Sequence, residues 1–217
     1  MAAIELFART SRAALLLVPL IVVGCIGGQG PVTTETRETR AFARIEVGAG
    51  VRLELSIGPA GPIEVSAQAN VLPAIGTDVS GDTLRIEARE DYTTTVPVTV
   101  TVTVPAIHAV SLSGGAAATI SGLDSDAIEL SVKGGARATV VGTTGTVTLT
   151  ADGGSTVDLG ALTAGEVSVT LAGGSAATVS ASGTVHGFAN GGSQLTVRGS
   201  AVVSVEESGG ASVVTDR

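Results

Sequence analysis

The chain is poor in the residues that build most catalytic and metal-binding sites. Its 217 residues include one cysteine, two histidines and no tryptophan, and aromatic side chains make up only 2%. A single cysteine cannot form a disulfide within the chain. The histidines, His108 and His186, lie far apart, and no motif supplies the partners that a metal site or a Ser-His-Asp triad would need. We interpret both histidines as surface or strand-edge residues.

Positive charge is also scarce. The chain holds 12 lysines and arginines against 20 aspartates and glutamates, which gives a formal net charge of −8 at pH 7. Proteins that bind nucleic acid cluster lysine and arginine to neutralise phosphates. Nucleic acid is therefore not an expected partner.

Glycine, by contrast, is abundant and regularly placed. Six Gly-Gly pairs punctuate the second half of the chain: Gly114-Gly115, Gly134-Gly135, Gly153-Gly154, Gly173-Gly174, Gly191-Gly192 and Gly209-Gly210. The steps between their first members (134−114, 153−134, 173−153, 191−173, 209−191) are 20, 19, 20, 18 and 18 residues. A period of this size is typical of solenoids, in which small units stack to bury an apolar side that no single unit can bury alone.

The residues around each pair alternate between apolar and polar, as strands do. Before the pairs come apolar residues two apart, such as Val147 and Leu149. Five residues after the second glycine come Ile120, Val140, Leu159, Val179 and Val197. Each repeat therefore reads as strand, Gly-Gly turn, strand and a looser turn.

Two all-β architectures fit this pattern. The first is a right-handed parallel β-helix with coils of 18–20 residues, in which the glycines supply positive φ at tight corners. The alternative is an antiparallel meander or sandwich of Gly-Gly hairpins. The β-helix is favoured by columns of like residues, including Thr119, Thr139, Asp158, Thr178 and Thr196. It also predicts that Lys133 and Asp152, each one residue before a glycine pair, stack on adjacent coils about 4.8 Å apart.

The N-terminus has the features of a bacterial export signal. Arg9 and Arg12 precede an uncharged apolar run that is too short to span a membrane comfortably and ends at Cys25. The sequence Val-Val-Gly-Cys at residues 22–25 resembles a lipobox, which implies cleavage after residue 24 and lipidation of Cys25. We therefore expect residues 1–24 to be a signal peptide and the mature protein to be an exported, membrane-anchored lipoprotein. Ile26 carries no retention acid, which favours the outer membrane.

The rest of the chain divides into two parts. Residues 25–40 are predicted to be the lipidated cysteine and a solvated tether, because they contain few apolar residues. Residues 41–217 are predicted to form a single domain, with divergent coils at 41–110 and Gly-Gly repeats at 111–217. Pro97 and Pro105 flank an alternating Val/Thr strand, which favours a strand end or an unpaired sheet edge there.

Several landmarks resemble the GIN domain, the head domain of a proposed family of auto-transporter adhesins. They are Phe42-x-x-Ile45-x-Val47, Asn70-Val71-Leu72-Pro73 leading to Thr77, Gly81 and Leu84, and Val-Thr-Val-Thr-Val-Pro followed by Leu-Ser-Gly-Gly at 112–115. The resemblance runs from about residue 40 to the end. It implies a β-helix-like fold and a role in cell adhesion, and it brings no catalytic residues.

Acidic residues gather at two places. Asp124, Asp126 and Glu129 are predicted to lie in one loop, and Glu206-Glu207 in another. Solvated turns account for both groups, although a weak calcium site in the first loop is an alternative. The segment Gly-Gly-Ser-Thr-Val-Asp-Leu, which contains Asp158, only distantly resembles calcium-binding nonapeptides. We predict no catalytic residue, no metal and no cofactor.

The sequence therefore predicts a non-enzymatic, envelope-anchored β-helical lipoprotein that adheres to or binds a surface. Its expected partners are the membrane, through the lipid, and a surface glycan or envelope protein. Sugar stacking is disfavoured, because only Phe42, Tyr92 and Phe188 remain as aromatic platforms after the signal is removed. The alternatives are a glycan-active enzyme on a pectin-lyase-like β-helix and a structural protein of envelope assembly.

Overall fold

The computed structural model describes residues 25–216, and strands make up 66% of the structure. Within this range there is no α-helix, only a short 3₁₀ helix, η1 (Leu72–Ala74), so no helix of the described part could span a membrane. The strands are β1 (Ile26–Gly27), β2 (Val32–Arg37), β3 (Arg44–Val47), β4 (Arg52–Ile57), β5 (Ile63–Gln68), β6 (Ile75–Ser80), β7 (Thr83–Ala88), β8 (Tyr92–Thr93), β9 (Thr99–Val104), β10 (Ala109–Leu112), β11 (Ala117–Lys133), β12 (Arg137–Asp152), β13 (Thr156–Leu171), β14 (Ala176–Ala189), β15 (Gln194–Arg198), β16 (Val202–Glu207) and β17 (Ser212–Asp216).

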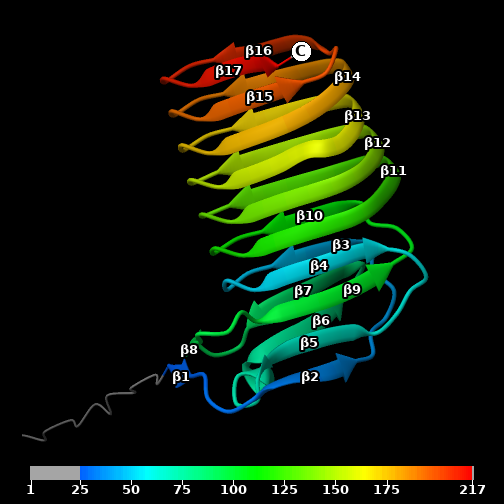
Figure 1. Cartoon of the computed structure of the whole chain (residues 1–217), viewed down its shortest axis with the longest axis vertical. Helices are drawn as coiled ribbons and strands as arrows, with labels where there is room; N and C mark the ends of the chain where they lie inside the picture. The colour runs from blue at the N-terminus through cyan, green and yellow to red at the C-terminus, as the bar shows by residue number, and fades with distance from the viewer. Residues whose placement is uncertain (1–24, 217) are drawn as a thin grey trace, which may run out of the picture.

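The second half of the chain is a parallel solenoid of about five turns. Each of β11 to β14 leaves one glycine corner, curves around the far side and returns to the next corner, so that one strand supplies both faces of a coil (Figure 1). Every strand from β10 to β17 pairs in parallel with its neighbours. The predicted parallel β-helix is confirmed, and the antiparallel hairpin alternative is wrong.

The register predicted from the repeats is also correct. Lys133 is paired with Asp152 on the next coil. The predicted column is continuous through five coils and comprises Thr119, Thr139, Asp158, Thr178 and Thr196.

Alternate side chains along each strand fill one apolar core between the two faces of the coils. The predicted core positions Ile120, Val140, Leu159, Val179 and Val197 are at most 2% exposed. The residue after each glycine pair is also buried in most coils, and it is always alanine or serine because the coil is narrow at its corner. Ser175 Oγ donates to the carbonyl of Ala151 at 3.1 Å.

The glycine corners stack directly on one another. Both glycines of every pair have positive φ, between 58° and 80°. Backbone hydrogen bonds join successive corners; for example, Gly135 N donates to Gly153 O at 3.0 Å. One corner lies outside the predicted series: Ala49 and Gly50 have φ of 56° and 68°, and Gly50 N donates to Gly114 O. The search for Gly-Gly pairs missed it because its first residue is alanine.

The coils of the first half do not follow chain order. The β3–β4 coil lies between the β7–β9 coil on one side and the β10–β11 coil on the other. Along the chain, the middle coil (β3–β4) therefore comes first and the coil beneath it (β7–β9) second. The chain then crosses over to β10 (Figure 1). The predicted divergent coils at 41–110 exist, but they are out of sequence order.

Antiparallel strands close the N-terminal end of the solenoid. β6 pairs with β7, and β5 pairs with β9 and with β2. Residues 25–40 were predicted to be a solvated tether, but much of this segment is paired with the domain. β1 pairs with β8, and β2 pairs along its whole length with β5. Side chains of β2 are mostly exposed, as expected, but its backbone hydrogen bonds hold it to the domain.

The alternating Val/Thr strand is β9, and it is not an edge. It pairs with β4 on one side and β5 on the other. Pro97 and Pro105 lie just outside its two ends, where a missing N–H costs no ladder hydrogen bond. The strand-end interpretation was correct and the edge interpretation was wrong.

Candidate binding surfaces

The solenoid presents two outward faces built from columns of single residues. One face is formed by β3, β7, β10, the second halves of β11 to β14, and β16; the other is formed by β4, β9, the first halves of β11 to β14, β15 and β17. On the first face, a column of small hydroxyl side chains runs through Ser111, Ser131, Thr150 and Thr170. Both faces are therefore broad and largely polar.

Phe188 ends the hydroxyl column. It follows Thr170 in register and is 55% exposed, whereas Phe42 and Tyr92 are half-buried. The preceding Gly187 has φ of 134°, and a Cβ there would overlap the carbonyl of Val169. Only glycine fits this position on the core side of the strand, and the next residue, Phe188, faces solvent. A count of aromatic residues cannot show that one of them is exposed.

The predicted acidic loop does not exist. Asp124, Asp126 and Glu129 are exposed residues of the continuous strand β11. Glu129 lies 3.8 Å from Arg44, and Asp124 accepts a hydrogen bond from Thr143 at 3.3 Å. The loop interpretation failed because the second corner of each coil is a bent strand rather than a loop. Glu206 and Glu207 likewise belong to a strand, at the end of β16.

No described part of the chain gathers metal ligands. Between residues 25 and 216 there is no group of three or more His, Cys, Asp or Glu side chains that could hold a metal ion. Asp158 instead accepts a hydrogen bond from Gly160 N at 2.9 Å.

The two histidines are on the surface, as predicted. His108 is exposed in the link before β10. His186 lies on β14, where its Nδ1 is 3.6 Å from Glu166 Oε1. They lie on different coils and do not form a joint site.

Cys25 is exposed and lies next to the domain. Ile26 N donates to Asp91 O at 2.8 Å, and Gly28 N donates to Thr93 O at 2.7 Å. Asn70 adds a side-chain hydrogen bond to the carbonyl of Gly27 at 2.7 Å. The predicted lipidation residue is therefore one residue away from a paired strand. The predicted signal peptide, residues 1–24, lies outside the described residues.

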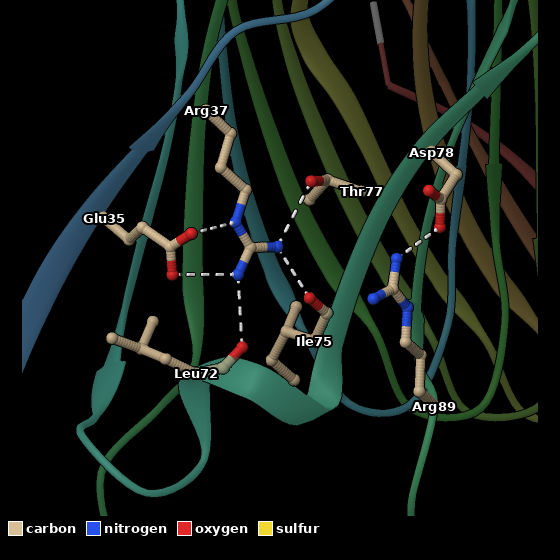
Figure 2. Close-up of polar contacts among 7 residues, drawn as sticks. All are labelled: Glu35, Arg37, Leu72, Ile75, Thr77, Asp78 and Arg89. Carbon is tan, nitrogen blue, oxygen red and sulfur yellow. Dashed lines mark hydrogen bonds and ion pairs between the residues drawn. The ribbon is translucent and has the colours of Figure 1, made fainter.

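The strands and η1 that close the N-terminal end of the solenoid form its cap. Within this cap, Arg37 links β2 to η1 and β6 (Figure 2). Its guanidinium donates to both carboxylate oxygens of Glu35, to the carbonyls of Leu72 and Ile75, and to Thr77 Oγ1, at distances between 2.6 and 3.2 Å. Only 17% of the Arg37 side chain is exposed. Nearby, Arg89 makes a more exposed pair with Asp78 at 2.9 Å. The Arg37 contacts use all the forked donors of the side chain, so they indicate a structural role.

A surface hollow of about 590 Å³ lies beside β8. It is lined by the segment from Tyr92 to Val98, by the corners at Gly50 and Gly115, and by Arg52 and Arg137. The Tyr92 hydroxyl donates to Ala49 O at 2.7 Å, and burial raises the pKa of Tyr92. No sequence motif marks this hollow, because its residues come from coils far apart in the chain.

These features define a class: a capped parallel β-solenoid with broad polar faces. Residues 41–201 match the family model described as "Putative auto-transporter adhesin, head GIN domain". The chain belongs to this family, as its landmarks indicated. An adhesin-like family is in keeping with a surface or exported protein. A comparison with curated proteins gave no match.

Solved structures share the fold. A protein described as a "putative adhesin" from Bacteroides fragilis is 17% identical, with a TM-score of 0.71 over 88% of this chain and 100% of its own. Another from Parabacteroides merdae is 16% identical, with a TM-score of 0.61 over 88% and 99%. A "putative lipid binding protein" from Parabacteroides distasonis is 14% identical, with a TM-score of 0.56 over 89% and 100%. At these identities the likeness concerns the fold alone.

Proposed function

We propose that this protein is a lipid-anchored, non-enzymatic module of the cell envelope that binds a surface glycan or an envelope protein through its outward faces. The observation that carries the proposal is the arrangement of those faces. Within residues 25–216 they present single side chains in columns that stack in register from coil to coil. Adhesion needs only a broad area of many weak contacts.

The position of Cys25 supports anchoring at the capped end. Cys25 adjoins β1 at the N-terminal end of the molecule, and the coils from β11 onward extend away from it (Figure 1). A lipid on Cys25 would hold the cap near the membrane and leave the C-terminal coils, including Phe188, at the far end. A binding face at the far end can reach a partner outside the membrane.

The anchor is tested by fractionation. Wild-type protein is expected to sediment with membranes and to incorporate labelled palmitate, whereas Cys25→Ser is expected to become soluble or to accumulate as the precursor. Separation of the inner and outer membranes then tests the outer-membrane assignment. An unlabelled wild type that stays on membranes together with Cys25→Ser would refute the lipoprotein proposal.

Binding is tested with arrays. Residues 25–217 are presented to glycan and envelope-protein arrays, with polysaccharide cleavage assayed in parallel. We expect saturable binding without turnover. Phe188→Ala is expected to weaken that binding more than Val214→Ala, since Val214 is equally exposed, at 56%, but lies on the opposite face. Turnover abolished by changing Asp124 and Asp126 would establish the enzyme alternative, and binding to an assembly partner alone would establish the structural one.

A further inference from the structure

We propose that the hollow beside β8 binds the phosphate group of an anionic membrane lipid through Arg52 and Arg137. This inference rests on the proposed anchoring at Cys25. The two arginines belong to one column of the solenoid: Arg52 on β4 is in register with Ala117 on β11, which is in register with Arg137 on β12. Their Cα atoms are thus two coil spacings apart, about 9.6 Å, and the small side chain of Ala117 leaves the space between them open.

The charge of the hollow is opposite to that of the chain as a whole. Its lining contains two arginines and no carboxylate, although the sequence has 20 acidic and only 12 basic residues. Both arginines are exposed, and within residues 25–216 neither makes a side-chain ion pair or hydrogen bond. By contrast, Arg37, Arg44, Arg85, Arg89 and Arg198 each lie within 4.0 Å of a carboxylate oxygen. Arg52 and Arg137 therefore keep their donors free for an anion.

The shape and lining of the hollow suit a phosphate. Guanidinium groups recognise phosphate oxygens with paired, charge-assisted hydrogen bonds. Thr93 and Thr95 also line the hollow and add hydroxyl groups, whereas the hydroxyl of Thr94 is engaged by Gln68 and Val96. The volume of about 590 Å³ is large enough for a lipid headgroup.

The location favours a membrane lipid as the source of that phosphate. β8 forms one wall of the hollow and pairs with β1. Cys25 immediately precedes β1, so the predicted anchor lies beside this wall. A lipid on Cys25 would bring the hollow close to the headgroups. Each arginine near an anionic membrane surface contributes about 1 kcal/mol, which is a factor of about five in affinity.

Vesicle co-sedimentation tests the proposal without the anchor. The chain from residue 25 onward shares one core, and with Cys25→Ser it carries no lipid. We expect it to bind phosphatidylcholine vesicles that contain phosphatidylglycerol and not vesicles of phosphatidylcholine alone. Arg52→Ala and Arg137→Ala are each expected to weaken binding about fivefold, with no change in melting temperature because both side chains are exposed.

The control is Arg198→Ala, which removes a positive charge from an exposed side chain on the same face but far from the hollow, where that charge is paired with Asp216. Equal binding to both kinds of vesicle, or equal weakening by Arg198→Ala and Arg137→Ala, would overturn the proposal. Binding of inorganic phosphate at the arginines without vesicle binding would show a small-anion site and overturn the membrane assignment. The vesicle result does not depend on acylation, so failure of the Cys25 fractionation experiment would be seen separately.

Discussion

At the scale of single residues, the fold depends on which side of the strand a residue faces and on which glycines touch a neighbouring corner. Val169 is completely buried, whereas Thr170, the next residue, is exposed. The two glycines of a corner also differ. A Cβ on the first would lie 2.8–3.5 Å from a backbone nitrogen of the preceding corner, and one on the second would meet nothing within 4 Å.

The buried side of the strand is tested by a pair of substitutions. Val169→Asp is expected to destabilise the protein by about 4 kcal/mol, because it buries an unpaired charge in the apolar core. Thr170→Asp is expected to change stability by less than about 0.5 kcal/mol. Urea unfolding followed by circular dichroism measures both. Similar midpoints for the two variants would contradict the assignment of the faces.

The corners are tested with alanine. In Gly173→Ala the new Cβ would lie 2.8 Å from Gly153 N and overlap an Asp152 carboxylate oxygen. In Gly174→Ala only the left-handed backbone is unfavourable, which costs about 1 kcal/mol. We expect Gly173→Ala to cost more than about 2 kcal/mol and to lower the melting temperature further than Gly174→Ala. The reverse order would mean that close corner stacking does not constrain these glycines.

At the scale of elements, β2 is attached to the domain by its ladder with β5 and by Arg37. The guanidinium satisfies the carbonyls of η1 and of the start of β6, which would otherwise lack this donor (Figure 2). β2 begins a few residues after Cys25, the predicted anchor residue, so this contact helps to hold the segment between the anchor and the solenoid to the domain.

Removing Arg37 is therefore expected to loosen β2. Arg37→Ala should cost about 3 kcal/mol, because hydrogen bonds of a largely buried charged group are lost together. Hydrogen exchange should rise in β2 and η1 ahead of global unfolding. The control is Arg89→Ala, which removes an exposed ion pair worth less than about 1 kcal/mol. Unchanged exchange in β2 would show that the ladder with β5 alone holds it.

At the scale of the whole molecule, the solenoid is held by contacts between neighbouring coils. Such a structure is stable where a coil is covered on both sides and weaker at its ends. β12 and β13 each have a long parallel partner above and below. Within the described residues, β16 pairs only with β14 and β17 only with β15, whereas antiparallel strands close the other end.

Native-state hydrogen exchange should follow this arrangement. We expect the slowest amides in β12 and β13 and faster exchange in β16 and β17, because the terminal coil can open without disrupting the others. Mass spectrometry of peptic fragments gives the order. Equal protection of the terminal and central coils would contradict nearest-neighbour stacking or indicate that a partner covers the end.

Much of the solenoid could be predicted from residues alone. Glycine pairs mark the corners because two successive positive φ angles exclude most other residues, and alternation with a period of two assigns the faces. Because the strands stack in parallel, equivalent residues of each repeat must pair, which is why the Lys133 and Asp152 register was correct. The family landmarks indicated the same fold.

Other features were decided only by tertiary contacts. The Ala49–Gly50 corner, the out-of-order β3–β4 coil and the docking of β2 depend on pairings between distant segments, which leave no periodic mark in the sequence. The acidic residues of β11 were placed in a loop because a bent strand and a loop look alike in composition. The exposure of Phe188 and the meeting of Arg52 with Arg137 across Ala117 follow from the same stacking, which brings residues 85 positions apart in the chain within two coils of each other.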